Sequence, residues 1–315
     1  MIGAAGTIPT ALVYISLHSA GSVSHICAII LPMNWKTKAF IGFAKMVKPG
    51  WRANALFGFL SGALKAAGPR RGVAMKNAEI VFPDKTADER KRIVDESYES
   101  MIWTGLEVMS MQRDPSLVDK WAVEVVGREH VEEAFSRGKG VICVSAHIGN
   151  WEHSAAWIGR NCRAVGIVRH SDEPFQRELI ETLRENLGLR TLDKHEPMLR
   201  AVSILKRNEM LGLLCDQHED GFKAPFFGRE AGTVQGPAVF AYLTHAPIIP
   251  IYGKRLEPFR FRIVIGPEIK LEKGPDREST IADTTIKINR ELEKMVLAAP
   301  GQWLWQHRRY REMDY

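Results

Sequence analysis

The fold of this chain is most constrained by a short apolar run at residues 141–144. Val141-Ile142-Cys143-Val144 follows two glycines and leads through Ser145 to His147. An uninterrupted run of small and β-branched residues is typical of a strand buried on both faces of a parallel sheet. Asn150 is a suitable N-cap for a helix that starts near Trp151. The pattern therefore places His147 at the carboxyl end of a core strand, where α/β sheets bind their ligands.

Strand-like and helix-like segments alternate along most of the chain. The expected strands cover 123–126, 164–168, 210–215, 247–252 and 260–264, and the expected helices cover 86–111, 128–137, 151–160, 174–187, 197–206, 233–245 and 280–297. This alternation predicts an α/β fold with a mostly parallel central sheet flanked by helices. Polar residues follow three of the strands, at His147, Arg169 and Asp216.

The first part of the chain has a different charge pattern. Of 43 basic and 37 acidic residues, nine basic residues and no acidic ones precede Glu79, which leaves 34 basic against 37 acidic residues afterwards. These bases are interleaved with apolar and aromatic residues, which suits an anionic membrane surface better than nucleic acid. A solvated basic face is the alternative. Residues 1–33 lack charged side chains, but serines and histidines interrupt them too often for a good transmembrane span.

Two helices, at 36–47 and 51–66, carry a wide apolar stripe with flanking Arg52 and Lys65. We expect an N-terminal amphipathic helical membrane-binding segment at 1–66, followed by a catalytic domain at 67–315. On periodicity alone, an ordinary core-facing helix pair fits equally well. Met33-Asn34-Trp35 resembles a natural protein start. Residues 1–32 are therefore either part of this membrane-binding segment or an upstream extension without a functional role.

His147 and Glu152 are the leading candidates for chemistry. If a helix starts near Trp151, Glu152 falls in its first turn and folds back toward His147. A histidine oriented by a carboxylate can remove a proton from a hydroxyl, so this pair predicts a general base. The structural alternative is a buried core histidine. A zinc site with His147, Glu152 and His153 is another, but the chain has no HExxH and its four cysteines form no CxxC pair, so no metal is expected.

His147-Ile148-Gly149-Asn150-Trp151-Glu152 resembles the H-x4-D/E motif of the lysophospholipid acyltransferase superfamily. More specifically, the chain resembles the bacterial lipid A biosynthesis acyltransferases from about residue 50 to 311. The matching segments are Asn77 with Phe82-Pro83; Val168-Arg169; Asp216-Gln217; Pro225-Phe226-Phe227-Gly228; Ala231, Thr233 and Gly236-Pro237-Ala238; Ala246-Pro247 with Pro250; and Pro300-Gly301-Gln302-Trp303-Leu304-Trp305 with His307-Arg308-Arg309. H-x4-E alone is a weak match, whereas this ordered set is specific.

The resemblance implies an acyltransferase on the cytoplasmic face of the bacterial inner membrane. Its donor would be an acyl thioester on acyl carrier protein, with no other cofactor. Its acceptor would be a hydroxyl of a lipid A precursor or of another glycolipid. His147 would be the base and Glu152 its orienting carboxylate, without a covalent enzyme intermediate. The motif has Glu where the wider superfamily commonly has Asp, and the weakly hydrophobic N-terminus favours attachment through residues 36–66 over a transmembrane anchor.

Further residues are candidates for binding substrate. Arg169 or the amides at the Asn150–Trp151 helix start are expected to donate to the oxyanion. The other candidates, which follow from the matching segments, are Asp216, Arg229, Thr233, Arg308 and Arg309. Arginine forks bind phosphates and carboxylates well, although a structural ion pair is an equal alternative for each arginine. Asp216 would orient a substrate hydroxyl, hold His147 or stabilise a turn. A non-enzymatic lipid-binding module remains the rival function.

Overall fold

The computed structural model describes residues 11–13, 29–31, 34–44 and 47–311. The elements are β1 Ala11–Val13, β2 Ile29–Leu31, α1 Trp35–Ala44, α2 Trp51–Ala67, α3 Arg71–Val81, α4 Ala87–Arg113, α5 Leu117–Trp121, β3 Ala122–Val126, α6 Arg128–Ser136, β4 Val141–Ser145, α7 Trp151–Cys162, β5 Ala164–Val168, α8 Pro174–Asn186, β6 Arg190–Asp193, α9 Met198–Lys206, β7 Met210–Leu214, β8 Lys223–Phe226, β9 Arg229–Gly232, α10 Gly236–Thr244, β10 Ile248–Glu257, β11 Arg260–Ile265, α11 Arg277–Ala298 and the 3-10 helix η1 Pro300–Gln302.

A seven-stranded sheet forms the centre of the molecule, in the order β3-β11-β10-β4-β7-β5-β6. Strands β10, β4, β7, β5 and β6 run parallel, and β11 turns back antiparallel to β10. The predicted α/β fold with a mostly parallel sheet is therefore confirmed. Strands β4 and β7 are neighbours although their last positions, Ser145 and Leu214, are 69 positions apart in the sequence; these two residues pair in register. The residues after these two strands must therefore meet at one edge of the sheet.

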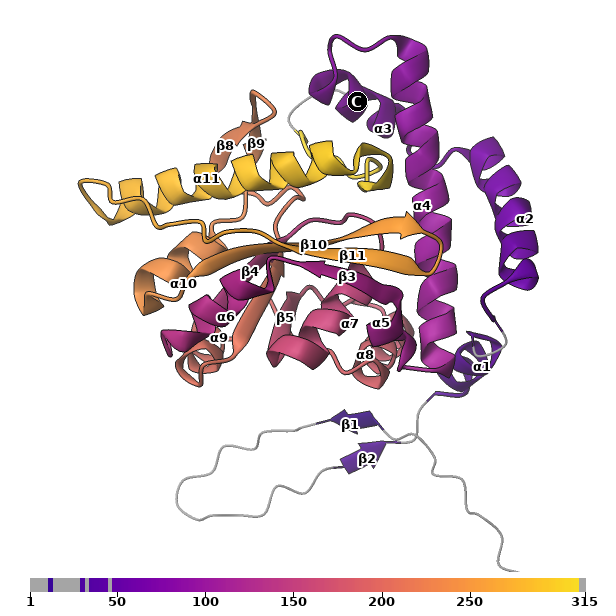
Figure 1. Cartoon of the computed structure of the whole chain (residues 1–315), viewed down its shortest axis with the longest axis horizontal. Helices are drawn as coiled ribbons and strands as arrows, with labels where there is room; N and C mark the ends of the chain where they lie inside the picture. The colour runs from indigo at the N-terminus through magenta and orange to yellow at the C-terminus, as the bar shows by residue number, and fades with distance from the viewer. Residues whose placement is uncertain (1–10, 14–28, 32–33, 45–46, 312–315) are drawn as a thin grey trace, which may run out of the picture.

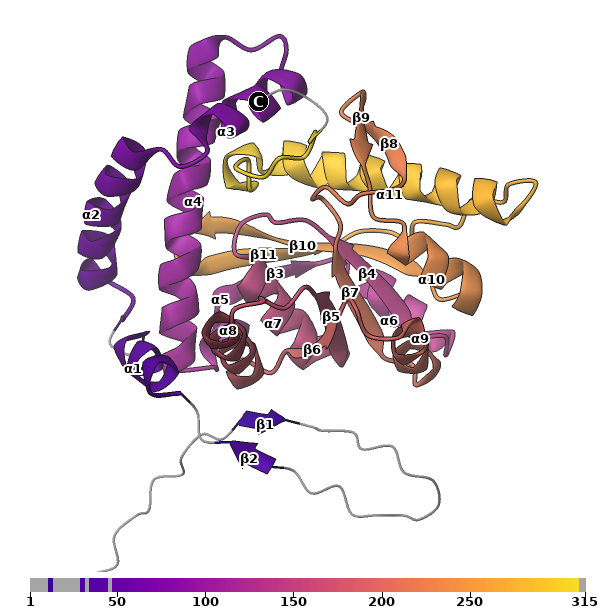
Figure 2. The same cartoon turned by 180° about the vertical axis from the view of Figure 1, so that it is seen from behind.

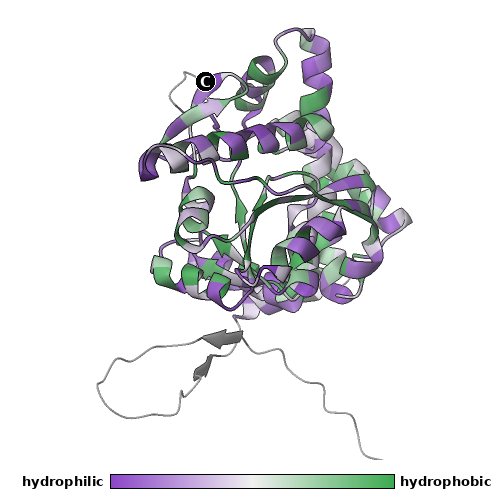
Figure 3. Ribbon diagram, turned by 60° about the vertical axis from the view of Figure 1, so that its left-hand side comes forward, coloured by the Kyte–Doolittle hydropathy of each residue, from purple (hydrophilic) through white to green (hydrophobic). Residues whose placement is uncertain are grey.

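Helices cover both faces of the sheet (Figure 1). In β4, Ile142 and Val144 pack into one core cluster with α10 and α11, whereas Val141 and Cys143 pack into the other with α6 and α7. Because successive strand side chains point to opposite faces, an all-apolar strand is needed to fill both clusters. Colouring by hydropathy shows green strands inside and purple helix surfaces outside (Figure 3).

The N-terminal helices lie beside the long helix α4, on the side away from the sheet (Figures 1 and 2). Phe57 of α2 stacks on Trp103 of α4, with ring centroids 4.4 Å apart. No helix within the described residues is long and apolar enough to cross a membrane. The proposed upstream extension at 1–32 lies largely outside the described residues.

Strand β6 and the hairpin β8–β9 are among the strands that were not predicted from the sequence. Strand β6 lies at the edge of the sheet and pairs only with β5. Its sequence is polar, so it lacks the apolar run by which the core strands were recognised. The hairpin β8–β9 replaces an expected loop, and its turn residues Phe227 and Gly228 both have positive φ, 50° and 73°. Such turns usually contain Asn or Gly at the first position, so phenylalanine there gave no turn signal.

Candidate active site

His147 and Asp216 meet at the carboxyl ends of the neighbouring strands β4 and β7. The Nδ1 atom of His147 lies 2.8 Å from one carboxylate oxygen of Asp216, and the backbone N–H of His147 donates to the other oxygen at 3.0 Å. The His147 side chain remains 17% exposed, whereas Asp216 is buried. The carboxylate therefore fixes the imidazole while leaving it accessible.

A tryptophan completes the environment of Asp216. The indole Nε1–H of Trp303 donates to the carboxylate at 2.7 Å. Burial alone would raise the pKa of Asp216, but the charge of His147 and the hydrogen bonds from His147 and Trp303 outweigh it and lower the pKa to about 2. The carboxylate is therefore ionised and holds the proton of His147 on Nδ1. The lone pair of His147 is then on Nε2, the atom that can act as a base.

The structure corrects the predicted partner of His147. Both carboxylate oxygens of Glu152 accept hydrogen bonds from Arg184 of α8, at 2.9 and 2.7 Å, instead of one oxygen contacting His147. Glu152 does occupy the first turn of α7, as expected. The Arg184 fork binds both oxygens at once, which a single imidazole N–H cannot do.

The loop that carries His147 is held from three sides. The carbonyl of His147 accepts a hydrogen bond from Leu304 N at 3.0 Å. The next glycine, Gly149, donates its N–H to the Gln302 carbonyl at 3.0 Å and accepts from Thr104 Oγ1 at 2.9 Å. Gly149 has φ +59°, and a Cβ there would lie 2.5 Å from the carbonyl oxygen of Gly253. Only glycine fits this position without moving the loop.

Beneath this loop lies a buried ion pair between Glu107 of α4 and Arg255 of β10. Arg255 donates to both carboxylate oxygens of Glu107, at 2.9 and 2.8 Å. Asn150 is fully buried; its side chain donates to Glu107 at 3.0 Å and accepts from His153 N at 2.9 Å, which confirms it as the N-cap of α7. Its side chain is thus committed to the scaffold, which leaves the backbone amides at the Asn150–Trp151 helix start as the expected substrate contact.

A mostly apolar cavity of about 80 Å³ lies beside the His147 loop, between Ser145 and Trp151. Its floor contains Cys143, Gly212 and Gly166, which pair across three adjacent strands and share one face of the sheet. Its other walls include Ser154, Ala155 and Ile158 of α7, and Glu152 and Arg184 also line it. Trp151 lines the cavity too and meets the His147 ring edge-on, with centroids 5.4 Å apart. The small floor residues keep this apolar space open beside the His147 loop.

The predicted arginines fall into two groups. Arg169, with 68% of its side chain exposed, follows β5 at the same sheet edge, and Arg229 and Arg308 are also exposed. Arg309 is fully buried: its guanidinium donates to the Gly232 carbonyl and to Thr233 Oγ1, and it lies 4.6 Å from the centroid of the Phe226 ring. Thr233 is buried as well. Burial favours the structural alternative for Arg309 and Thr233.

His153 does not join His147 and Glu152 as a metal ligand would. Its Nε2 lies 2.9 Å from the Val118 carbonyl, and its ring stacks on Phe261 with centroids 4.2 Å apart. No group of three or more potential metal ligands gathers among the residues that the structure describes.

Sequence reasoning missed Arg184, Glu107 and Gln217. Gln217 Nε2 lies 3.5 Å from His147 Nε2, beside the base atom. Its adjacency to Asp216 in the sequence was the available signal. Arg184 and Glu107 lie on helices that local patterns could not place against the His147 loop.

This geometry agrees with a match to a protein family. A family model described as bacterial lipid A biosynthesis acyltransferase matches residues 28–312. The chain belongs to this family. It is an acyltransferase, and the resemblance inferred from the ordered motifs is confirmed.

Three curated relatives give the range of named activities. The chain is 26% identical to a lipid A biosynthesis lauroyltransferase of Escherichia coli K12, over 79% of this chain and 81% of the relative. It is 27% identical to a lipid A biosynthesis palmitoleoyltransferase of the same organism, over 77% and 79%. A phosphatidylinositol mannoside acyltransferase of Mycolicibacterium smegmatis is 26% identical over 41% of this chain and 45% of the relative.

Proposed function

We propose that this protein transfers a fatty acyl chain from acyl carrier protein to a hydroxyl of a lipid A precursor. The observation that carries the proposal is a histidine base held by a buried carboxylate beside an apolar cavity. The dyad supplies proton transfer, and the lining of the cavity has the polarity for a hydrocarbon chain. Acyl carrier protein and lipid A come from the family and from the names of its relatives.

The reaction needs only side chains that surround His147. Nε2 of His147 takes the proton of the acceptor hydroxyl while the hydroxyl oxygen bonds to the thioester carbonyl carbon. The carbonyl π electrons move onto its oxygen, which becomes an oxyanion. When the carbonyl re-forms, the C–S bond breaks, and the imidazolium returns its proton to the leaving thiolate. Asp216 orients the ring and stabilises its cationic form throughout.

Glu152 and Arg184 have a different part in this proposal. Their ion pair lies in the wall of the cavity and neutralises two charges next to the acyl chain. Because each side chain is only about one fifth exposed, neither charge is easily left without its partner. The H-x4-E carboxylate would therefore shape the acyl cavity, whereas the catalytic carboxylate comes from β7.

The exposed arginines are suited to the acceptor. Arg169 follows β5 at the sheet edge that carries His147, and Arg308 is adjacent in sequence to His307 near the dyad. Phosphate groups on a glycolipid would pair with such forks. The mannoside acyltransferase among the relatives makes a phosphatidylinositol mannoside the second candidate acceptor.

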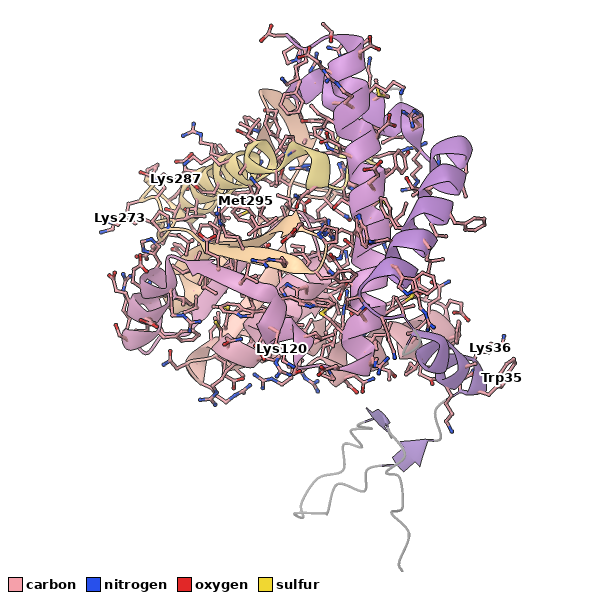
Figure 4. All side chains as sticks on the ribbon, turned by 45° about the vertical axis from the view of Figure 1, so that its right-hand side comes forward. Trp35, Lys36, Lys120, Lys273, Lys287 and Met295 are labelled. Carbon is pink, nitrogen blue, oxygen red and sulfur yellow. The ribbon has the colours of Figure 1, made fainter. Side chains whose placement is uncertain are left out.

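The N-terminal helices are suited to a membrane surface. Trp35, Trp51 and Phe59 are 73%, 75% and 74% exposed, and Lys36 and Lys38 lie on the same helix as Trp35. Figure 4 shows Trp35 and Lys36 projecting outward from α1. Exposed aromatic rings with nearby bases, in a stretch of sequence without an acidic residue before Glu79, favour interfacial attachment to anionic lipid. We therefore propose peripheral attachment to the cytoplasmic face of the bacterial inner membrane.

Purified protein, radiolabelled acyl carrier protein thioesters and a panel of acceptors will test the function. We expect mass spectrometry to detect one added acyl chain on a lipid A precursor, and none with a folded His147→Ala variant. If the acyl chain is transferred only to phosphatidylinositol mannoside or to lysophospholipids, that lipid replaces the lipid A precursor as the proposed acceptor. Absence of transfer from the wild-type protein to every acceptor, with lipid binding retained, would support the lipid-binding module instead.

A further inference from the structure

Three consecutive residues after β7 contact two different imidazole rings. Asp216 binds His147 Nδ1, Gln217 lies at His147 Nε2, and the backbone N–H of His218 donates to His307 Nε2 at 2.8 Å. The segment 216–218 therefore connects the ring of the base to a second histidine, His307, through consecutive residues. Helix α3 supports this arrangement, because Asn77 Nδ2 donates to the His307 carbonyl at 2.7 Å.

Gln217 places a hydrogen-bond donor beside the reacting atoms. Its side-chain nitrogen is 3.5 Å from the Nε2 lone pair of His147, which is long for a hydrogen bond. The attacking hydroxyl must come within about 3 Å of this lone pair to give up its proton. The carbonyl under attack is then one bond beyond that hydroxyl, within reach of the Gln217 amide.

His307 is held as a neutral donor. Its Nε2 accepts the N–H of His218, so the ring carries its proton on Nδ1. Among the described residues, no group forms a hydrogen bond with His307 Nδ1. This nitrogen is also not one of the fully buried side-chain atoms that lack a hydrogen bond. Burial, the largest influence, lowers the pKa of His307 to about 4; the nearby Asp216 acts in the opposite direction and His147 in the same one. The ring therefore stays neutral at physiological pH.

Acyl transfer requires donors for the oxyanion that are not consumed as acids. A neutral imidazole or an amide meets this need, because each polarises the carbonyl and keeps its proton. Building on the proposed function, we propose that Gln217 Nε2–H and His307 Nδ1–H are the side-chain donors that stabilise the oxyanion of the thioester carbonyl. The acceptor hydroxyl takes the place of the Gln217 amide at His147 Nε2, and the amide then donates to the new oxyanion.

The side chains of Asn150 and Arg169 are less suitable as oxyanion donors. Asn150 has its side chain committed to Glu107 and to the helix cap. Arg169 is 68% exposed, and its guanidinium lies 3.7 Å from Asp172. The backbone amides at the start of α7 remain the competing donors.

Steady-state kinetics of Gln217→Met test the first donor. Methionine keeps the shape and removes the N–H, so we expect kcat to fall about 10²-fold while KM for the acyl donor changes less than about 3-fold. Gln217→Glu should lose at least as much, and its carboxylate should move the acidic limb of the pH–rate profile to higher pH by stabilising the protonated His147. Gln176→Met on the exposed surface of α8 is the matched control. If kcat of Gln217→Met stays within about 3-fold of wild type, the stabilisation of the oxyanion is assigned to the backbone amides at the start of α7 instead of to Gln217.

A pair of His307 variants tests the second donor. Asparagine retains a donor at the position of Nδ1, whereas glutamine retains an acceptor at the position of Nε2. If Nδ1–H serves the oxyanion, His307→Asn keeps most of kcat and His307→Gln loses about 10²-fold. If His307 only supports His218, the order is reversed. A reversed order, or equal losses in both folded variants, overturns the assignment.

Failure of the proposed function would look different. It would leave the wild-type protein without transfer to any acceptor, whereas failure of this inference leaves the wild type active and the Gln217 and His307 variants unchanged or altered only in KM.

Discussion

Asp216 and Glu152 both lie near His147, but they occupy contrasting environments. Asp216 is 1% exposed and binds the imidazole, the backbone and an indole; Glu152 is 23% exposed and is occupied by one guanidinium. The carboxylate that is closer in sequence is the one that does not contact the base. Five residues of separation across a helix start place Glu152 toward the cavity, while adjacent parallel strands bring Asp216 to the ring. Strand order, more than sequence spacing, therefore selects the partner of the base.

Replacing the buried carboxylate should have the largest effect. In Asp216→Asn the amide can donate to Nδ1, which moves the imidazole proton to Nε2 and removes the base. We expect kcat to fall on the order of 10⁴-fold, as when the triad carboxylate of a serine protease becomes an amide. Rate measurements on folded variant protein will check this. A loss below about 10-fold would remove Asp216 from the catalytic dyad.

Breaking the ion pair between Glu152 and Arg184 should have a smaller effect. Glu152→Gln leaves Arg184 without its charge partner beside the cavity, so we expect about a 10-fold loss of kcat/KM and about 1–2 kcal/mol of stability, after discounting for partial exposure. The reversed pair, Glu152→Arg with Arg184→Glu, should recover part of both. Chemical denaturation and acyl-donor kinetics will measure these changes. Loss as deep as in Asp216→Asn, without recovery in the reversed pair, would restore Glu152 as the direct partner of His147.

A substitution in the cavity floor should change the specificity for acyl-chain length instead of the rate. A Cβ on Gly212 would have no neighbour closer than 3.9 Å, so the backbone tolerates a side chain that projects into the cavity. Gly212→Leu should shift the preference toward shorter acyl chains several-fold, because the side chain occupies part of the apolar space. Competition between acyl carrier protein thioesters of different length will show the shift. Gly105→Ala on α4, also without close neighbours, is the control. An unchanged preference would place the acyl chain elsewhere.

Acid titration should show an effect on stability that is confined to low pH. The pKa of Asp216 is depressed to about 2 from 3.8, so its stabilising contribution is complete above pH 3.8 and is lost as the pH falls toward 2. The contribution is about 2 kcal/mol. Unfolding free energies of wild type and Asp216→Asn should therefore converge across this window. If the two curves of unfolding free energy against pH stay parallel, the Asp216 carboxylate is not ionised beside His147 in the folded protein.

The sequence was most informative where one residue pattern had one physical cause. The apolar runs at 141–144, 164–168 and 210–214 predicted core strands, because a strand buried on both faces has no other composition. His147 and Asp216 were both recognised as polar residues after such strands. Their contact was left open as one of three roles for Asp216, since local patterns do not reveal that β7 inserts between β4 and β5.

Partners contributed by distant helices were harder to predict. Arg184 is one of several charged residues on an amphipathic helix, and only the packing of α8 near α7 singles it out. Likewise, Trp303 is buried, as is usual for a large apolar side chain, but its Nε1–H donates to Asp216. Burial can be predicted from side-chain type, but the one polar atom of a buried side chain finds its partner only through the tertiary fold.

The contacts made by residues 302–307 also have a consequence for biosynthesis. Gln302, Trp303, Leu304 and His307 contact the His147 loop, Asp216 or His218, and they leave the ribosome after every other element of the site. A nascent chain should therefore carry a folded sheet before it carries a competent base. Ribosome-bound chains arrested after this segment has emerged should be active, and chains arrested before it should not. Activity in the shorter chains would show that the dyad assembles without its C-terminal support.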